Sequence, residues 1–303
     1  MGYEKLLIET AMKDERIIVM TAENRALVRN IPAVLGNRFI DTGITEQTMV
    51  GMAAGLALRG RIPIIHALAP FLAMRAFEFI RTDIGIARLP VKLSGYIPGL
   101  LSDGNGPTHQ AIEDVSLMRG IPGMEVYAPA DEDDLMKILP SVWASPHPAY
   151  VRVNHKAGNF THDPHTPGKA EIISEGSDVT ILVYGYLFGN ALETKLILEK
   201  RMSMSVGLVN MRSLKPVDEE AIVNVAAQGS NIVTIEDHFK TGGLFSIVAE
   251  TLLKNRISVP VIPISFGEHW FRPGILTEVL ENEGFLPEQM AEKIMKTTEK
   301  IKL

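Results

Sequence analysis

The residue best placed for chemistry is Glu46, within the run Phe-Ile-Asp-Thr-Gly-Ile-Thr-Glu-Gln-Thr-Met-Val-Gly-Met-Ala-Ala-Gly, residues 39–55. An apolar strand is predicted to end at Asp41, Gly43 permits a tight turn, and Thr45 is a favourable helix N-cap. These neighbours place Glu46 in the first turn of a helix, where the helix dipole favours a carboxylate. A Glu in this position either only complements the dipole or acts on a bound group.

The body of the same helix carries unusually small side chains. Gly51 and Gly55 lie four residues apart within it, and Gly60 is predicted to end it. Gly inside a helix costs about 0.5–1 kcal/mol relative to Ala, so the pair predicts that another backbone or a ligand lies close. Glu46 is thus expected at the mouth of a small-faced, buried helix.

Two other side chains have a chemistry suited to a substrate. His109 follows a Gly-Pro-Thr turn, and an imidazole there can move a proton or donate to a developing oxyanion near neutral pH. Its alternative role is to cap the loop. Arg152 ends an apolar strand, and its fork of donors suits a phosphate, although an ordinary surface Arg is the alternative.

The remaining histidines are given structural interpretations. His162 and His165 lie in a stretch without periodicity, and no carboxylate or third His is placed to complete a metal site. A solvated linker is therefore favoured over a metal site. His66 is interpreted as a core histidine with satisfied hydrogen bonds.

Composition excludes several classes of protein. The 303 residues include no Cys, which rules out disulfides, thiolate metal sites and cysteine nucleophiles. A net charge of −6 without a basic stripe argues against a nucleic-acid partner. The apolar run 49–58 is far shorter than the ~18 residues of a membrane span, and the amphipathic N-terminus does not read as a signal peptide. A cytoplasmic location is expected.

Strand and helix signals alternate in two halves, which predicts an α/β fold with two domains. Each domain is expected to be a mostly parallel sheet with helices on both faces. The predicted boundaries are 1–154 for the first domain, 155–170 for a linker and 171–303 for the second domain. Residues 95–109 are rich in Gly and Pro and too long for a simple connection, so they are predicted to form a functional loop.

Several motifs, taken in order and spacing over essentially the whole chain, resemble the transketolase family. They are Asp-Thr-Gly-Ile-Thr-Glu-Gln with Gly-Met-Ala-Ala-Gly-Leu-Ala, Gly106-Pro107-Thr108-His109-Gln110 with Glu113-Asp114, Pro129-Ala130-Asp131, Leu214-Lys215-Pro216-Val217-Asp218, and Glu236-Asp237-His238 before Gly242-Gly243-Leu244. The resemblance implies a pyrimidine-binding domain followed by the family's C-terminal domain.

The resemblance also implies a cofactor site. The Glu at the position of Glu46 hydrogen-bonds the aminopyrimidine of thiamin diphosphate in that family, and this bond favours the tautomer that deprotonates the thiazolium carbon. Phe71 matches the aromatic residue that stacks on the aminopyrimidine, and Leu68 stands where the family often has a second aromatic residue. The alternative for Phe71 is a core residue of a helix over 70–84.

For the substrate, the resemblance implies that His109 assists proton transfer and that Arg152 contacts the sugar phosphate. Asn105 stands where many members have an Asp, and Ile97 stands near the position of a His. Those groups read sugar hydroxyls in the family, so an altered preference for the acceptor's hydroxyl configuration is expected.

The chain has no segment like the family's Gly-Asp-Gly…Asn motif, which holds the metal and the diphosphate; Asp103-Gly104-Asn105 lies in the wrong context. The expectation is the C-terminal subunit of a split transketolase of the pentose phosphate pathway, with no metal ligands of its own. An N-terminal partner subunit would hold Mg²⁺, in an α2β2 heterotetramer that pairs this chain with itself through helix 46–58. The reaction would transfer a two-carbon ketol unit from a ketose phosphate to an aldose phosphate. Alternatives are an enzyme resembling deoxyxylulose-phosphate synthase and a non-catalytic regulatory or scaffold subunit.

Overall fold

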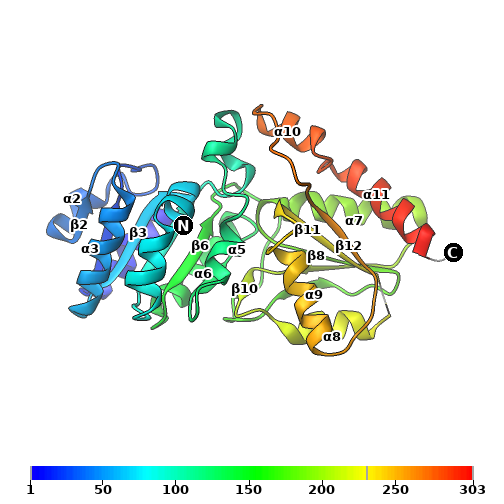
Figure 1. Cartoon of the computed structure of the whole chain (residues 1–303), viewed down its shortest axis with the longest axis horizontal. Helices are drawn as coiled ribbons and strands as arrows, with labels where there is room; N and C mark the ends of the chain where they lie inside the picture. The colour runs from blue at the N-terminus through cyan, green and yellow to red at the C-terminus, as the bar shows by residue number, and fades with distance from the viewer. Residues whose placement is uncertain (1, 230, 302–303) are drawn as a thin grey trace.

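The computed structural model describes residues 2–229 and 231–301 as two α/β lobes that lie side by side along the long axis (Figure 1). The N-terminus belongs to the first lobe, and the C-terminal helix runs along the outside of the second. Among the helices described, none has both the length and the apolar character needed to cross a membrane.

The first lobe is built on a mostly parallel sheet. Its described strands are β1 (Ile17–Thr21), β2 (Phe39–Asp41), β3 (Ile62–Leu68), β4 (Lys92–Tyr96), β5 (Glu125–Tyr127), β6 (Ala149–Val153) and β10 (Ser213–Lys215). They are arranged in the order β10-β5-β6-β4-β3-β1-β2, and only the β10–β5 pair is antiparallel. The edge strand β10 comes from the second half of the chain, so this half completes the first sheet.

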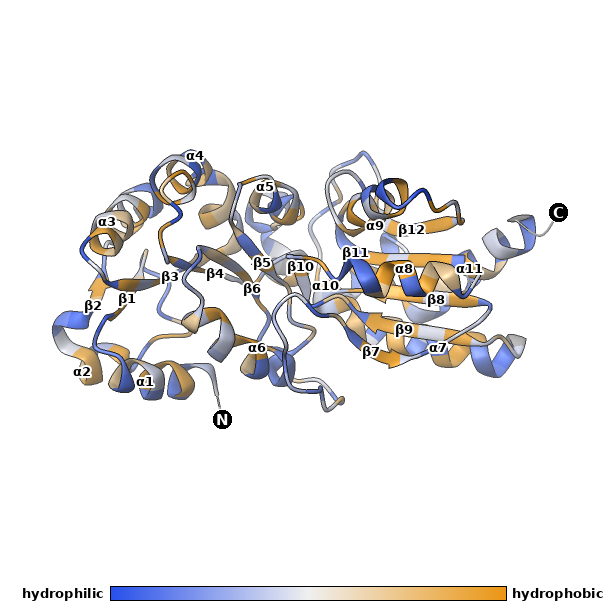
Figure 2. Ribbon diagram, turned by 90° about the horizontal axis from the view of Figure 1, so that it is seen from below, coloured by the Kyte–Doolittle hydropathy of each residue, from blue (hydrophilic) through white to orange (hydrophobic). Residues whose placement is uncertain are grey.

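Helices cover both faces of the first sheet (Figure 2). One face carries α3 (Glu46–Leu58), α4 (Phe77–Phe79) and α5 (Asp114–Arg119), and the other carries α1 (Tyr3–Lys13), α2 (Ile31–Leu35) and α6 (Glu132–Ala144). Strand residues alternate between the two cores: in β1, Ile18 and Met20 pack toward α3, while Ile17 and Val19 pack toward α1 and α6. Alternate side chains of a strand point to opposite faces, so each strand feeds both cores.

The second lobe repeats the design. Its described strands are β7 (Glu171–Ser174), β8 (Val179–Val183), β9 (Val206–Asn210), β11 (Asn231–Phe239) and β12 (Val261–Phe266), and its helices are α7 (Phe188–Met202), α8 (Glu219–Ala227), α9 (Leu244–Lys254), α10 (Leu276–Asn282) and α11 (Pro287–Ile301). The strand order is β12-β11-β8-β9-β7, with only β7 antiparallel. Both lobes confirm the predicted fold class.

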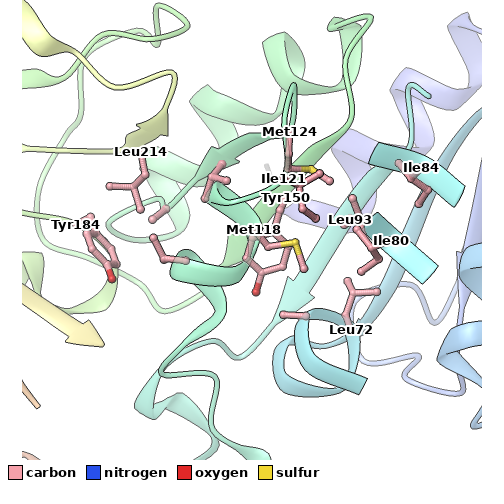
Figure 3. Close-up of a cluster of buried hydrophobic side chains, with 14 of the residues drawn as sticks. Leu72, Ile80, Ile84, Leu93, Met118, Ile121, Met124, Tyr150, Tyr184 and Leu214 are labelled. Carbon is pink, nitrogen blue, oxygen red and sulfur yellow. The ribbon is translucent and has the colours of Figure 1, made fainter. Parts of the chain in front are cut away.

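One apolar core passes from the first lobe into the second (Figure 3). It runs from Ile80 under the first sheet through Met118 and Tyr150 to Leu214 and Tyr184 of the second half. A continuous buried core resists separation of the lobes, because parting them exposes apolar surface at roughly 25 cal/mol per Å². The loops at the carboxyl ends of the strands are therefore held by both lobes.

Candidate functional site

Glu46 lies at the carboxyl edge of the first sheet, where β2 leads into α3. The residue is only 2% exposed, although it belongs to the first turn of a helix. Thr45 precedes the helix as predicted, but its hydroxyl donates to the carbonyl of Thr42 at 2.8 Å and accepts no hydrogen bond from the N–H groups of the first helical turn. The buried carboxylate is thus held by packing and by side-chain partners, and less by a capping motif.

Phe71 and His109 follow the next two strands along the chain, and their rings meet at the same edge of the sheet as Glu46. Phe71 begins a π-helical segment, Phe71–Arg75, directly after β3, and His109 lies in the loop after β4. Their rings contact edge to face with centroids 4.9 Å apart. Parallel strands end at the same edge of a sheet, which is where open α/β folds bind ligands. Leu68, half-buried, is the last residue of β3.

Arg75, a residue that the sequence did not single out, joins this group. Its Nη1 donates to both carboxylate oxygens of Glu46, at 3.2 and 3.3 Å. Its guanidinium carbon lies 4.1 Å from the centroid of Phe71, in cation–π geometry. The signal in the sequence was a basic residue four positions after Phe71, which one helical turn brings over the ring.

The loop between β4 and α5 carries Asn105 and His109 and is fixed at its start. Ile97 has a positive φ of 45°, an unusual conformation for a β-branched residue. Gly99 also has a positive φ, and a Cβ there would lie 1.6 Å from Asp237 Oδ2. Asn105 is exposed, and its amide donates to the carbonyl and hydroxyl of Ser102. The predicted role of Asn105 in substrate choice stays a prediction.

Arg152 does not present its guanidinium at a surface. The side chain is 1% exposed, and it donates to Asp114 at 3.0 Å and to Asp237 at 2.6 Å. A further bond reaches the carbonyl of Ala111. Burial opposes its charge, but the two carboxylates outweigh burial and raise the pKa of Arg152 well above its usual value. The interpretation of Arg152 as an ordinary surface residue is therefore wrong. The same geometry does not favour the predicted contact with a phosphate.

His162 corrects the expectation of a solvated linker. Residues 154–170 form no helix or strand and are mostly exposed, but His162 is 2% exposed. Its Nδ1 lies 2.7 Å from Glu171 of β7, and its Nε2 lies 3.3 Å from Asp131 of the first lobe. The expectation failed because the carboxylates come from distant segments. Asp134 also lies close enough for a metal-like cluster.

The polar groups around this cluster favour an ion-paired latch between the lobes. Asn210 donates to both Asp134 and Glu171 at 3.0 Å, and Arg212 donates to Asp134 at 2.9 Å. These donors occupy the carboxylate oxygens that a cation would need. His66, in contrast, confirms its interpretation as a core histidine: it is 1% exposed, with Tyr3 Oη at 2.7 Å and the Met20 carbonyl at 3.0 Å.

The latch predicts a pH-dependent stability. Burial opposes the charged form of His162, but its hydrogen bonds to Asp131 and Glu171 prevail and raise the pKa of His162 to about 9. A pKa raised above the unfolded value of about 6.5 gives a stabilisation that is complete below pH ~6.5 and lost as pH rises through ~9. Between pH 6.5 and 9.5 the unfolding free energy of wild type should decrease. In His162→Gln this decrease should be smaller by about 2–3 kcal/mol, as measured by urea denaturation at each pH.

His165 provides the matched control for this measurement. Burial lowers the pKa of His165 to about 4, so its ring stays neutral throughout that pH range. His165→Gln should therefore keep the wild-type dependence on pH. An unchanged dependence in His162→Gln would contradict the assigned latch.

Comparisons with known proteins agree with this architecture. The family described as transketolase, pyrimidine binding domain, matches residues 1–159, and transketolase, C-terminal domain, matches residues 168–290. The 6-deoxy-6-sulfo-D-fructose transketolase subunit of Clostridium sp. (strain MSTE9) is 34% identical, over 98% of this chain and 94% of that protein. The chain belongs to the transketolase family.

Two further similar proteins differ in length, one nearly equal to this chain and one about twice as long. A solved structure described as a split gene transketolase, inactive beta4 tetramer, is 33% identical with a TM-score of 0.88, over 97% of this chain and 96% of that one. The 1-deoxy-D-xylulose-5-phosphate synthase of Caldanaerobacter subterraneus subsp. tengcongensis is 30% identical over 97% of this chain. The chain spans about half of that synthase, 48% of its length.

Proposed function

We propose that this chain is the catalytic C-terminal subunit of a split transketolase, which transfers a two-carbon ketol unit from a ketose phosphate to an aldose phosphate. The observation that carries the proposal is the buried carboxylate of Glu46, which Arg75 links to the flat ring of Phe71. A carboxylate in a dry site next to an aromatic face suits a flat nitrogen heterocycle, because the edge of such a ring bonds the carboxylate while its face stacks.

These residues fit the aminopyrimidine of thiamin diphosphate. When bound, this cofactor supplies a carbon nucleophile and electron sink that the twenty side chains lack. Glu46 would hold the edge of the aminopyrimidine through a hydrogen bond and would favour the proton arrangement needed for activation. Phe71 stacks on the ring, and Leu68 adds an apolar contact. Magnesium and the diphosphate are assigned to the partner subunit.

On the substrate side we propose that His109 donates to or accepts a proton from the sugar oxygens. It is half-buried against Phe71, and its Nδ1 lies 2.9 Å from the hydroxyl of Thr108, which leaves Nε2 for a substrate. Asn105, exposed on the same loop, is proposed to meet the hydroxyls of the acceptor. Arg152 is given a positioning role, because its guanidinium holds Asp114, Asp237 and the carbonyl of Ala111.

The proposal includes a partner subunit and self-pairing. It is supported by relatives of nearly the same extent, one named as a subunit and one as a split gene product. The outer side of α3 also exposes apolar groups, with Met52 41% and Leu58 70% exposed, and no atom lies within 4 Å of a Cβ built at Gly55. A small, apolar, uncovered helix face suits close packing against another chain, as an α2β2 assembly requires.

The enzyme alternative is a synthase that uses pyruvate as donor, and it is favoured only by the likeness to 1-deoxy-D-xylulose-5-phosphate synthase. Glu46 and Phe71 are compatible with both reactions, because both use the same cofactor. The donor separates them: ketol transfer needs a ketose phosphate or hydroxypyruvate, whereas the synthase needs pyruvate.

Assembly provides the experiment for the proposal. The purified chain is titrated with thiamin diphosphate and Mg²⁺ by calorimetry, alone and with the candidate N-terminal subunit. We expect micromolar binding and ketol transfer only from the mixture, because this chain supplies contacts to the pyrimidine and the partner supplies those to the diphosphate. Micromolar binding and turnover without a second polypeptide would end the split-subunit reading, and turnover of pyruvate alone would favour the synthase.

A further inference from the structure

We propose that Arg75 is an internal competitor of the cofactor, because its guanidinium takes both contacts that the aminopyrimidine needs in this chain. The inference rests on the proposed function. A guanidinium and an aminopyrimidine edge share a flat N–C–N unit with N–H donors, and either can bond a carboxylate while its face lies on an aromatic ring. Arg75 satisfies both conditions, on Glu46 and on Phe71.

The distances make the two occupants mutually exclusive. The guanidinium carbon of Arg75 lies 4.1 Å from the centroid of Phe71, which is van der Waals contact. No second flat group can enter between them. Both oxygens of Glu46 already receive the same Nη1 of Arg75. A pyrimidine that stacks on this face of Phe71 and takes the same lone pairs of Glu46 must therefore displace the Arg75 side chain.

The same contacts show that displacement is easy. Charge-assisted N–H···O bonds are commonly about 2.7–2.9 Å long, whereas those from Arg75 to Glu46 measure 3.2 and 3.3 Å. The Arg75 side chain is 42% exposed, while that of Glu46 is only 3% exposed. Arg75 can therefore turn into solvent by rotating its own side chain, and Glu46 remains in place.

The backbone around Arg75 explains why only this side chain needs to move. Arg75 ends the π-helical segment, and the side-chain amide of Gln47 on α3 donates to its carbonyl at 3.4 Å. Leu72 and Ala73 of the same segment are fully buried. The segment is anchored, so binding exchanges one flat cation for another flat group on a fixed platform.

The competition has a measurable consequence for affinity. A partly exposed ion pair and one cation–π contact together correspond to roughly a 5- to 30-fold change in a binding constant. Arg75→Leu should lower the dissociation constant of the pyrimidine by this factor. The dissociation constant of Arg75→Lys should lie between those of wild type and Arg75→Leu, since an ammonium can still pair with Glu46 but cannot lie flat on Phe71.

The test is a titration of the full chain with 4-amino-5-hydroxymethyl-2-methylpyrimidine, followed by ligand-observed NMR. This probe carries the pyrimidine and no diphosphate, so the partner subunit is not needed. Arg81→Leu is the matched control, because Arg81 is exposed on the nearby segment Ile80–Gly85. This variant should bind the probe as wild type does. Thermal melts confirm that each variant is folded.

The outcomes separate this inference from the proposed function. Tighter binding by Arg75→Leu, with Glu46→Gln losing the probe, supports the competition. Equal or weaker binding by Arg75→Leu than by wild type overturns the competition and leaves the cofactor site standing. If neither wild type nor Arg75→Leu binds the probe at millimolar concentration, the competition is overturned, and the proposed function is decided by the assembly experiment with the partner subunit.

Discussion

Replacing Glu46 by Gln should lower ketol transfer by the assembled enzyme by about 10²–10⁴-fold, the usual contribution of a positioned acid–base group. The amide keeps the volume of the side chain but could not take up the proton that we propose the carboxylate would exchange with the aminopyrimidine. Deuterium exchange at the thiazolium carbon should fall with turnover. The measurement is proton NMR of the reconstituted complex, with steady-state kinetics beside it.

Folding should hardly change in the same variant. A carboxylate in the first turn contributes ~0.3–1 kcal/mol through the helix dipole, and its partner Arg75 is exposed enough to be hydrated alone. Glu78→Gln is the matched control, because Glu78 is exposed on α4. Near-normal exchange in Glu46→Gln, or an equal loss in Glu78→Gln, would show that the role assigned to Glu46 is incorrect.

Local patterns predicted much of the fold. The helix expected over 46–58 has those bounds in the structure, because its start signal at Thr45 and its end signal at Gly60 are local in sequence. In the structure Glu46, Phe71 and His109 each follow a parallel strand, and the carboxyl ends of parallel strands lie at one edge of the sheet. The contact between Phe71 and His109 follows from that rule.

Partners that are distant in sequence could not be predicted in this way. Asp237 lies 85 residues after Arg152, and nothing near Arg152 indicates that a second lobe will bury it. His162 was misjudged for the same reason, since Asp131 belongs to the first lobe and Glu171 to a strand of the second. Strand β10 joins the first sheet from the second half of the chain, which periodicity alone does not show. Each case depends on how the lobes pack.

The largest loss of stability is expected at Arg152. Arg152→Met keeps most of the length of the side chain but leaves Asp114 and Asp237 buried without their cation. Breaking a buried pair in this way costs about 3–5 kcal/mol, because an uncompensated charge remains in the interior. Urea denaturation at neutral pH should show this decrease in the free energy of unfolding.

The same change should loosen the loop before α5, because Arg152 also donates to the carbonyl of Ala111, and Asp237 lies against Gly99. Hydrogen exchange over residues 97–111 should therefore rise more than the global loss of stability accounts for.

A triple variant isolates the cause. Asp114→Asn and Asp237→Asn added to Arg152→Met remove the charges that the single change exposes, so part of the lost stability should return. Arg81→Met, at an exposed position, serves as the control for loss of an Arg. A contact with the sugar phosphate would give a different pattern, because Arg152→Met would then raise KM for phosphorylated sugars while leaving the unfolding free energy unchanged. Such a result would show that Arg152 binds the substrate and does not stabilise the junction between the lobes.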